Sequence, residues 1–135
     1  MDTQINKILF DGLKEYNSRH RKHGNEILEV SPKNKVYPFT VLSTVRDSDI
    51  KTVTSRYGKR SSKGYRLDIY AQNKGKILRK EIADDIAQQL DVFMSDIVNL
   101  ERTSYNGFDL ENDGSVFHLI VMYSSEYDEY RRKFT

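Results

Sequence analysis

Residues 116–123 are apolar at almost every position, and this run limits the possible folds more than any other part of the sequence. Its apolar members are Val116, Phe117, Leu119, Ile120, Val121 and Met122. A strand alternates its side chains between the two faces of its sheet, so apolar residues on both faces indicate a central strand. Both faces must then be covered, either by helices of the same chain or by a neighbouring subunit.

Two stretches are expected to form helices. Over residues 76–93 the apolar residues recur at intervals of four, four, four and three, which places them on one side of a helix. They are Leu78, Ile82, Ile86, Leu90 and Phe93. A second apolar stripe predicts a helix over residues 3–17. It consists of Ile5, Ile8, Leu9, Leu13 and Tyr16.

Shorter segments with alternating or continuous apolar residues are expected to form strands. They are residues 36–45, 50–57, 65–71, 97–103 with a continuation at 108–111, and 116–123. Gly58 and Gly64 enclose a polar loop, so the second and third segments would form a hairpin with an exposed tip.

The order of helix, strands, helix and strands indicates an α+β fold, in which an N-terminal helix and a long central helix pack on an antiparallel sheet. A length of 135 residues fits a single domain, residues 1–135. Residues 126–135 place Tyr127, Tyr130 and Phe134 among charges without a core-facing period. We expect either a tail that docks on a neighbouring subunit or a final helix that packs on its own domain.

The composition excludes several classes of protein. There is no cysteine, which excludes a disulfide framework, thiolate catalysis and thiolate metal sites. The start of the chain lacks the basic and then apolar run of a signal peptide. The longest apolar run near the C-terminus is far too short to span a bilayer. We expect no membrane association, and the expected compartment is a cytosol.

Few residues are arranged for catalysis. His20 and His23 are spaced to share a metal on a helix, but the neighbouring Arg and Lys residues would repel a cation. Asp68, Gln72 and Lys74 are arranged partly like the metal ligands of a nuclease, but Gln72 stands where a carboxylate is needed. The sequence holds no phosphate-binding loop and no nucleophile elbow. We therefore expect no enzymatic activity, no metal and no cofactor.

Charge is distributed unevenly along the chain, although the net charge is only +2. Residues 46–66 carry seven basic and two acidic side chains, and residues 67–130 carry five basic and thirteen acidic ones. Segments of opposite charge favour head-to-tail packing of identical copies, which can close into a ring. The alternative is that these charges only solvate exposed faces.

The basic segment also indicates an alternative function. Tyr57 and Tyr65 are interleaved with its cations, a combination that contacts phosphates and stacks on bases. The cations are Arg56, Lys59, Arg60, Lys63 and Arg66. The acidic second half of the chain argues against a dedicated nucleic-acid-binding protein. A small nucleic-acid-binding protein that uses the basic 56–66 hairpin is therefore the alternative, and a metal nuclease ranks third.

Five segments, taken in order, resemble the tail terminator (tail completion) proteins of long-tailed phages. They are the strand at 36–42 with its Tyr-Pro-Phe motif, the strand at 65–71, the helical segment at 81–86, the turn at 112–114 and the strand at 117–121. The resemblance covers residues 4–125. Head-tail joining proteins share this size and style, so the position of the ring in the neck stays open.

The resemblance implies a structural virion protein that forms a ring, typically a hexamer, in the phage neck. The ring would cap the finished tail tube, end its polymerisation and join the tail to the head connector. Its partners would be further copies of itself, the tail tube protein and a head-completion protein, with DNA only as passing cargo in the lumen. Assembly would take place in the host bacterial cytoplasm. The residues expected at its interfaces are Arg56, Lys59, Arg60, Lys63, Arg66, Tyr127, Tyr130 and Phe134.

Overall fold

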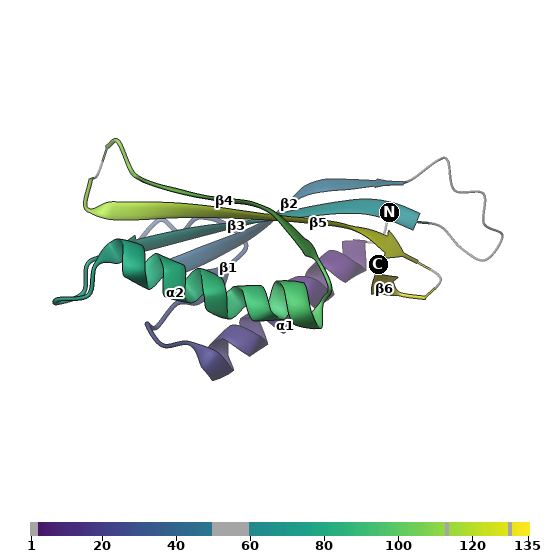
Figure 1. Ribbon diagram of the computed structural model, residues 1–135, viewed down its shortest axis with the longest axis horizontal. Helices are drawn as coiled ribbons and strands as arrows, with labels where there is room; N and C mark the ends of the chain where they lie inside the picture. Colours follow the sequence, from purple (N-terminus) through teal and green to yellow (C-terminus); the bar gives the residue numbers. More distant parts are fainter. Residues whose placement is uncertain (1–2, 50–59, 113, 130) are drawn as a thin grey trace.

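The computed structural model describes residues 3–49, 60–112, 114–129 and 131–135 (Figure 1). The elements are α1 (Thr3–His20), β1 (Glu26–Leu28), β2 (Phe39–Asp49), β3 (Arg60–Gln72), α2 (Arg79–Asp91), the π-helical turn η1 (Val92–Ile97), β4 (Glu101–Asp109), β5 (Val116–Asp128) and β6 (Lys133–Phe134). The helix predicted over residues 3–17 is present as α1 and continues to His20.

The strands form one sheet in the order β1-β2-β3-β5-β4, and β6 pairs with the end of β5. The two longest strands, β3 and β5, have 13 residues each and lie side by side in the middle of the sheet. They pair antiparallel along their whole length, from Arg60 opposite Asp128 to Gln72 opposite Val116. The central strand predicted at residues 116–123 is therefore confirmed, and it continues to Asp128.

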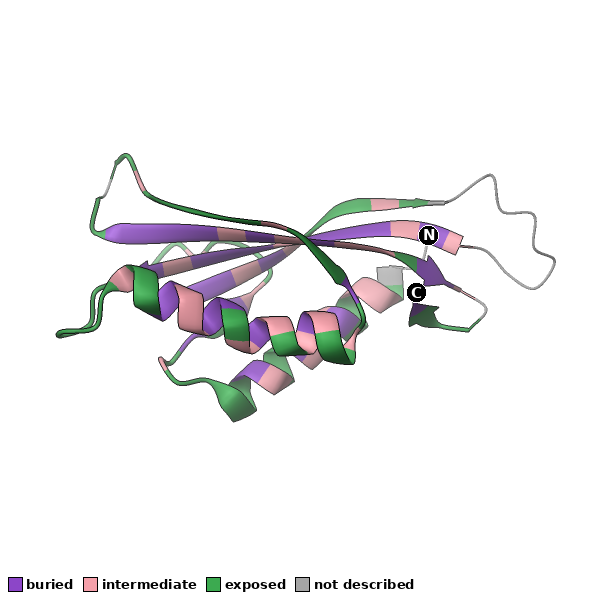
Figure 2. Cartoon of the chain, viewed as in Figure 1, coloured by how far each residue is buried: buried purple, intermediate pink, exposed green. Residues whose placement is uncertain are grey.

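Both helices lie against the same face of the sheet (Figure 1). Alternate residues of the central strands point into the core beneath these helices, among them Leu67 and Ile69 of β3 and Leu119 and Val121 of β5. The buried side of α2 completes the core with Ile82, Ala83, Ile86, Ala87 and Leu90. Buried residues are concentrated along β3, β5 and the inner sides of the helices (Figure 2). No helix of the described chain covers the other face of the sheet.

The second helix, α2, begins at Arg79, three residues later than the start at residue 76 that the apolar spacing predicts. The chain turns at Gly75, whose φ is +62°, and Lys74 and Ile77 form an isolated bridge before the helix. At the helix start, the side-chain oxygen of Asn73 accepts a hydrogen bond of 2.7 Å from the backbone N–H of Arg79. This bond satisfies one of the N–H groups that a helix start leaves without a partner. α2 and η1 together form one helix of 19 residues.

The predicted fold class, an antiparallel sheet with an N-terminal helix and a long central helix packed on it, is wrong. The described chain is mainly β, with 44% of its described residues in strands and 30% in helices, and its six-stranded sheet is curled and mixed. The parallel pair is β1 with β2, from Glu26 opposite Phe39 to Leu28 opposite Val41. Parallel neighbours need a crossover between them, and residues 29–38 provide it. With three residues, β1 is too short to show a strand period in the sequence.

Two glycines that resemble strand breaks in the sequence lie inside strands. Gly64 lies in β3 opposite a bulge of β2, and a Cβ atom added there would be 3.1 Å from the Cβ of Arg46. Gly107 lies in β4, and a Cβ atom added there would be 2.4 Å from Cζ of Phe117. At both positions a neighbouring side chain approaches the backbone closely, so an added Cβ atom would require that side chain to shift.

The boundaries of three predicted segments change as a result. The polar loop predicted between Gly58 and Gly64 is wrong for residues 60–64, because these belong to β3. The two pieces predicted at 97–103 and 108–111 are joined in one strand, β4, which runs only from Glu101 to Asp109, and Ile97 belongs to η1. The strand predicted at 50–57 lies outside the described residues.

Candidate protein-interaction face

The sheet face opposite the helices is the most distinctive surface of the described chain, and we call it the open face. Its side chains belong to the strand positions that alternate with the core positions. They are Phe39, Val41 and Ser43 of β2, Arg66, Asp68 and Tyr70 of β3, His118, Ile120 and Met122 of β5, and Ser104, Asn106 and Phe108 of β4. Val41, Ile120 and Met122 are only half-buried, so apolar surface remains accessible in the isolated chain.

A row of aromatic rings crosses one end of the open face. Phe39 stacks on Tyr70 with 4.9 Å between ring centroids, and Tyr70 stacks on His118 with 4.2 Å. Phe108 meets His118 edge-on at 5.1 Å, and Tyr37 extends the row beyond Phe39 at 5.4 Å. Successive rings from Phe39 to Phe108 lie on directly opposed residues of neighbouring strands, and such cross-strand pairs stabilise a sheet. The row ends at the sheet edge, where Phe108 is 43% exposed.

An ion-pair network lies next to the aromatic row. The guanidinium of Arg66 donates hydrogen bonds of 2.8 and 3.0 Å to Asp68, and Nε2 of His118 lies 2.7 Å from the same carboxylate. Burial alone would raise the pKa of Asp68, but the hydrogen bonds from His118 and Arg66 outweigh burial and hold it below its ordinary value. The hydrogen bond to Asp68 also raises the pKa of Arg66. The network therefore keeps a neutralised ion pair on this face and fixes the ring of His118.

This network is poorly arranged for acid–base catalysis. A catalytic histidine must bring a ring nitrogen within hydrogen-bond reach of the proton that it transfers. The ring of His118 is buried, with Tyr70 against its face and Phe108 against its edge. His118 therefore serves as a packed, hydrogen-bonded member of the row.

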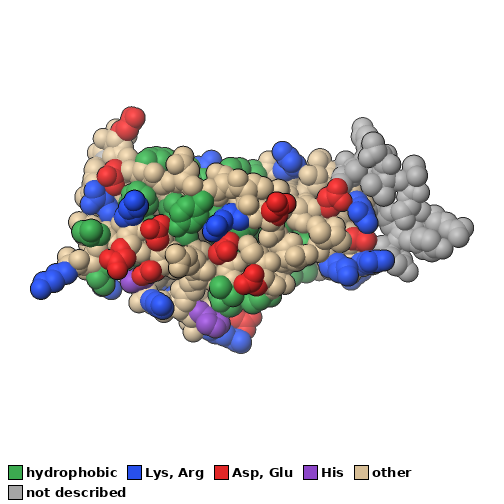
Figure 3. Space-filling model, in the orientation of Figure 1, with side chains coloured by type: hydrophobic (Ala, Val, Ile, Leu, Met, Phe, Trp, Pro, Cys, Tyr) green, Lys and Arg blue, Asp and Glu red, His purple; other side chains and the backbone are tan. Residues whose placement is uncertain are grey.

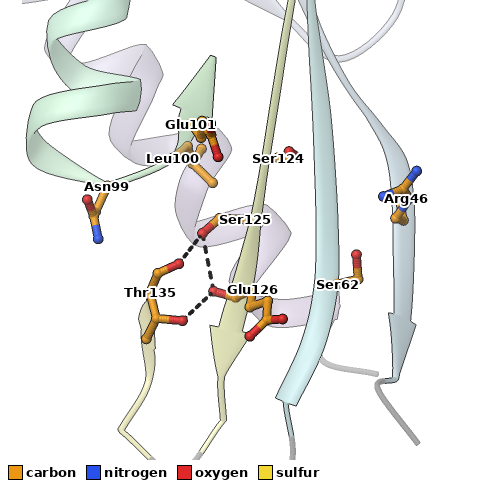
Figure 4. A pocket seen from close by; sticks show the side chains of 9 residues that line it. All are labelled: Arg46, Ser62, Asn99, Leu100, Glu101, Ser124, Ser125, Glu126 and Thr135. Atoms are coloured by element: carbon orange, nitrogen blue, oxygen red, sulfur yellow. Dashed lines mark hydrogen bonds between the residues drawn. The ribbon is translucent and has the colours of Figure 1, made fainter. Parts of the chain in front are cut away.

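The other end of the open face is polar and carries a hollow of about 450 Å³ (Figure 4). Arg46 and Ser62 line it from β2 and β3, and Glu101 lines it from the start of β4. Figure 4 shows the chain end closing one side, where the Oγ of Ser125 donates a 2.7 Å hydrogen bond to the carbonyl oxygen of Thr135. The hollow lies beside β5 between two paired stretches. Ser124 is the last residue of β5 that pairs with β4, and Tyr127 is the first that pairs with β6.

The structure separates the residues expected to form a basic interface. Arg56, Lys59 and Tyr130 lie outside the described residues. Among the described cations, Arg60 lies 3.2 Å from Glu126, and Lys63 is fully buried. Nζ of Lys63 lies 2.5 Å from Asp47. Because Arg66 pairs with Asp68, each of these three cations is matched by a carboxylate of its own chain.

Tyr127 and Phe134, expected in a docking tail or a final helix, lie in the chain's own core. The tail forms the short strand β6, in which Phe134 pairs with Tyr127 of β5. The ring of Phe134 lies 5.0 Å from that of Tyr127 and 6.2 Å from that of Tyr65. Both side chains are buried. These two aromatic residues therefore hold the tail against its own sheet.

The charged side chains visible in Figure 3 are mixed in sign. Acidic and basic residues are interspersed over the described part of this view, and hydrophobic side chains reach the surface in small groups among them. The uneven charge of the sequence therefore does not produce a large patch of one sign on this side of the described chain.

The two candidate metal ligands of α1 and its following loop have separate partners. His20 Nδ1 lies 2.9 Å from the carbonyl oxygen of Tyr16, and His23 Nε2 lies 3.1 Å from Asp85 of α2. Within the described ranges, no three residues of the types His, Cys, Asp and Glu are grouped to hold a metal ion.

The aromatic row was missed in the sequence, although each ring occupies a regular strand position. Its members Phe39, Tyr70, Phe108 and His118 are far apart in sequence. Alternation assigns each ring to one face of its own strand, but only the strand order brings them together. The pairing of β3 with β5, which are not consecutive in the chain, was the missing information.

No protein-family model matches the chain, and no curated protein matches it. Among the described helices, none is long and apolar enough to cross a membrane.

Proposed function

We propose that this chain is a structural subunit of the neck of a long-tailed phage, of the tail terminator type. Copies of it form a ring that caps the tail tube, ends its polymerisation and joins the tail to the head connector. The proposal rests on the sequence resemblance and, in the structure, on the open face. A sheet face without helices that retains half-buried apolar residues is typical of a surface that another protein covers.

The open face supports protein binding better than nucleic-acid binding. Nucleic-acid affinity comes mainly from cations that neutralise phosphates. Arg66, the cation that the described central strands place beside the aromatic row, is engaged by Asp68 through hydrogen bonds to both carboxylate oxygens. The rings are also largely stacked on one another, so their faces are not free for bases. A salt-sensitive complex of the monomer with single-stranded DNA would favour the alternative.

Native mass spectrometry tests the proposal. The purified chain is measured alone and with the tail tube protein of the same phage. We expect a closed ring of identical copies, formed alone or on the tube. A chain that stays monomeric in both samples would overturn the proposal.

A further inference from the structure

The sheet has two incompletely paired edges, and they lie on opposite sides of the molecule. On one side is β4, whose strand partner in the described chain is β5 alone. On the other side is β2, which β1 covers only from Phe39 to Val41. Among the described residues, the outer edge of β2 beyond Val41 has no strand partner. An unpaired edge presents backbone N–H and C=O groups that can pair with another chain.

The middle of the β4 edge lacks the charged side chains and prolines that usually discourage such pairing, and the one bulge of the strand lies near its start. Its middle, residues 103–108, contains no charge and no proline. Tyr105 and Phe108 are 41% and 43% exposed on opposite faces of this strand. β4 is also held in place, because the hydroxyl of Tyr105 donates a 2.6 Å hydrogen bond to Asp84 of α2. The middle of the edge is therefore a fixed, uncharged template for an added strand.

We infer that copies of this chain associate head to tail by pairing β4 of one copy with the outer edge of β2 in the next copy. The inference rests on the proposed ring and identifies its subunit contact. β2, β3, β5 and β4 alternate in direction across the sheet, so β4 runs antiparallel to β2. A second copy placed beside the first along the sheet therefore continues the antiparallel order.

One register matches the irregularities of both strands. Each edge strand has a single bulge, between Thr44 and Arg46 in β2 and between Arg102 and Ser104 in β4. When Ser43 lies opposite Asn106 of the next copy, the two bulges are one residue apart, and the extra residue of one strand compensates for that of the other. A bulge disturbs the ladder, so adjacent bulges disturb it in one place instead of two.

The same register also matches charge. Asp47 of one copy then lies opposite Arg102 of the other, both on the helix side of the sheet. Within its own chain the guanidinium of Arg102 lies 3.9 Å from Asp91 and 5.2 Å from the centre of the Tyr105 ring, and Asp47 is bonded to Lys63 and Asn6. Opposite charges directly across a strand pair stabilise it.

A hollow beside β2 lies where the register places an aromatic side chain. Tyr105 faces Thr44 of the next copy, on the helix side of the joined sheet. There a hollow of about 450 Å³ opens beside β2, lined by Phe10 of α1, Leu42 and Thr44 of β2 and Tyr65 of β3, among others. In this register the exposed part of the Tyr105 side chain, which keeps its hydrogen bond to Asp84, borders the partly apolar walls of this hollow.

Cysteine cross-linking tests the inference directly, because the natural chain has no cysteine. The variant Ser43→Cys/Asn106→Cys places one thiol on each edge of the open face. Within one chain two strands separate these positions, a distance of roughly 14 Å at the usual strand spacing. A disulfide needs Cα atoms within about 7 Å, so any bond must join two copies.

We expect the double variant to form a reducible series of linked dimers, trimers and larger products. The single variants, and Ser43→Cys/Gln88→Cys with its second thiol on the exposed side of α2, should give at most traces. Strong dimers from Asn106→Cys alone would overturn the inference in favour of symmetric β4 pairing. A ring in native mass spectrometry without cross-links would overturn the inference but leave the proposed function intact. A chain that remains monomeric with and without the tail tube protein would overturn both.

Discussion

Lys63 Nζ donates a 2.5 Å hydrogen bond to Oδ1 of Asp47, and the side chain of Lys63 is fully buried. The other oxygen of Asp47 accepts a 3.1 Å hydrogen bond from the side chain of Asn6. This carboxylate thus joins β2, β3 and α1 where the N-terminal helix meets the sheet. A lysine expected on a binding surface is instead part of the interior.

The first prediction concerns this buried pair. Asp47→Ala leaves the ammonium of Lys63 buried without its partner, and we expect a loss of roughly 3 kcal/mol in the free energy of unfolding. Replacing both residues, as in Asp47→Leu/Lys63→Met, should recover most of the loss, because no buried charge remains. Urea unfolding followed by circular dichroism measures both variants.

The exposed pair of Arg60 with Glu126 provides the control. Its two side chains are 42% and 50% exposed, so Glu126→Ala should cost less than about 1 kcal/mol. Equal losses from Asp47→Ala and Glu126→Ala would contradict the interior role of Lys63.

The second prediction concerns the response of stability to acid. Because the pKa of Asp68 is lowered in the folded chain, its contribution to stability is present above the unfolded pKa, which is about 3.9. It is lost as the pH falls through the lower folded value. Asp68→Asn should therefore be less stable than the natural chain at pH 7, and the difference should shrink from about pH 4 downward. Urea midpoints at pH 7, 5 and 3 test this, and a difference that grows on acidification would contradict it.

The third prediction concerns the close approach at Gly107. Gly107→Ala brings a methyl group against the ring of Phe117, and overpacking of this kind costs about 1–3 kcal/mol. Gly114→Ala is the matched control, since an added Cβ there meets no atom within 4 Å. Gly107→Ala/Phe117→Leu should regain part of the loss in thermal unfolding. An equal effect of the two single glycine variants would show that backbone entropy, and not the clash, is responsible.

The central strand could be predicted from the sequence, whereas the role of a glycine inside a strand could not. The run from Val116 to Met122 identifies a central strand because its apolar residues alone need cover on both faces. The described helices cover only one of those faces, and Ile120 and Met122 on the other remain half-buried. Gly64 is expected to end a loop but lies inside β3, because a glycine at a close contact and a glycine in a turn look the same in a sequence.

The candidate site depended on information that a single sequence does not hold. The aromatic row requires the strand order, and the pairing of Lys63 with Asp47 requires the register of β2 against β3. Charge counts along the chain treated Arg60, Lys63 and Arg66 as one basic surface. Strand alternation instead sends Lys63 to the helix side and Arg66 to the open face, each beside a carboxylate.

The fourth prediction concerns the edge of β4. A lysine on an exposed edge strand discourages pairing with another chain, so Asn106→Lys should weaken self-association at least tenfold. The free energy of unfolding of the monomer should change by less than about 0.5 kcal/mol, as is usual for surface substitutions. Sedimentation velocity over a concentration series measures the association, and Gln88→Lys adds the same charge on α2 as a control. Unchanged association of Asn106→Lys would show that β4 lies outside the interface.

The central claim is that the chain caps a tail tube and ends its growth. Electron microscopy of tubes growing from purified tail tube protein, with and without this chain, tests that claim most directly. We expect tubes that stop lengthening when the chain is added, each with a ring at one end, and weaker capping by Asn106→Lys. Tubes of unchanged length and with bare ends at a saturating concentration of the chain would contradict the proposed function.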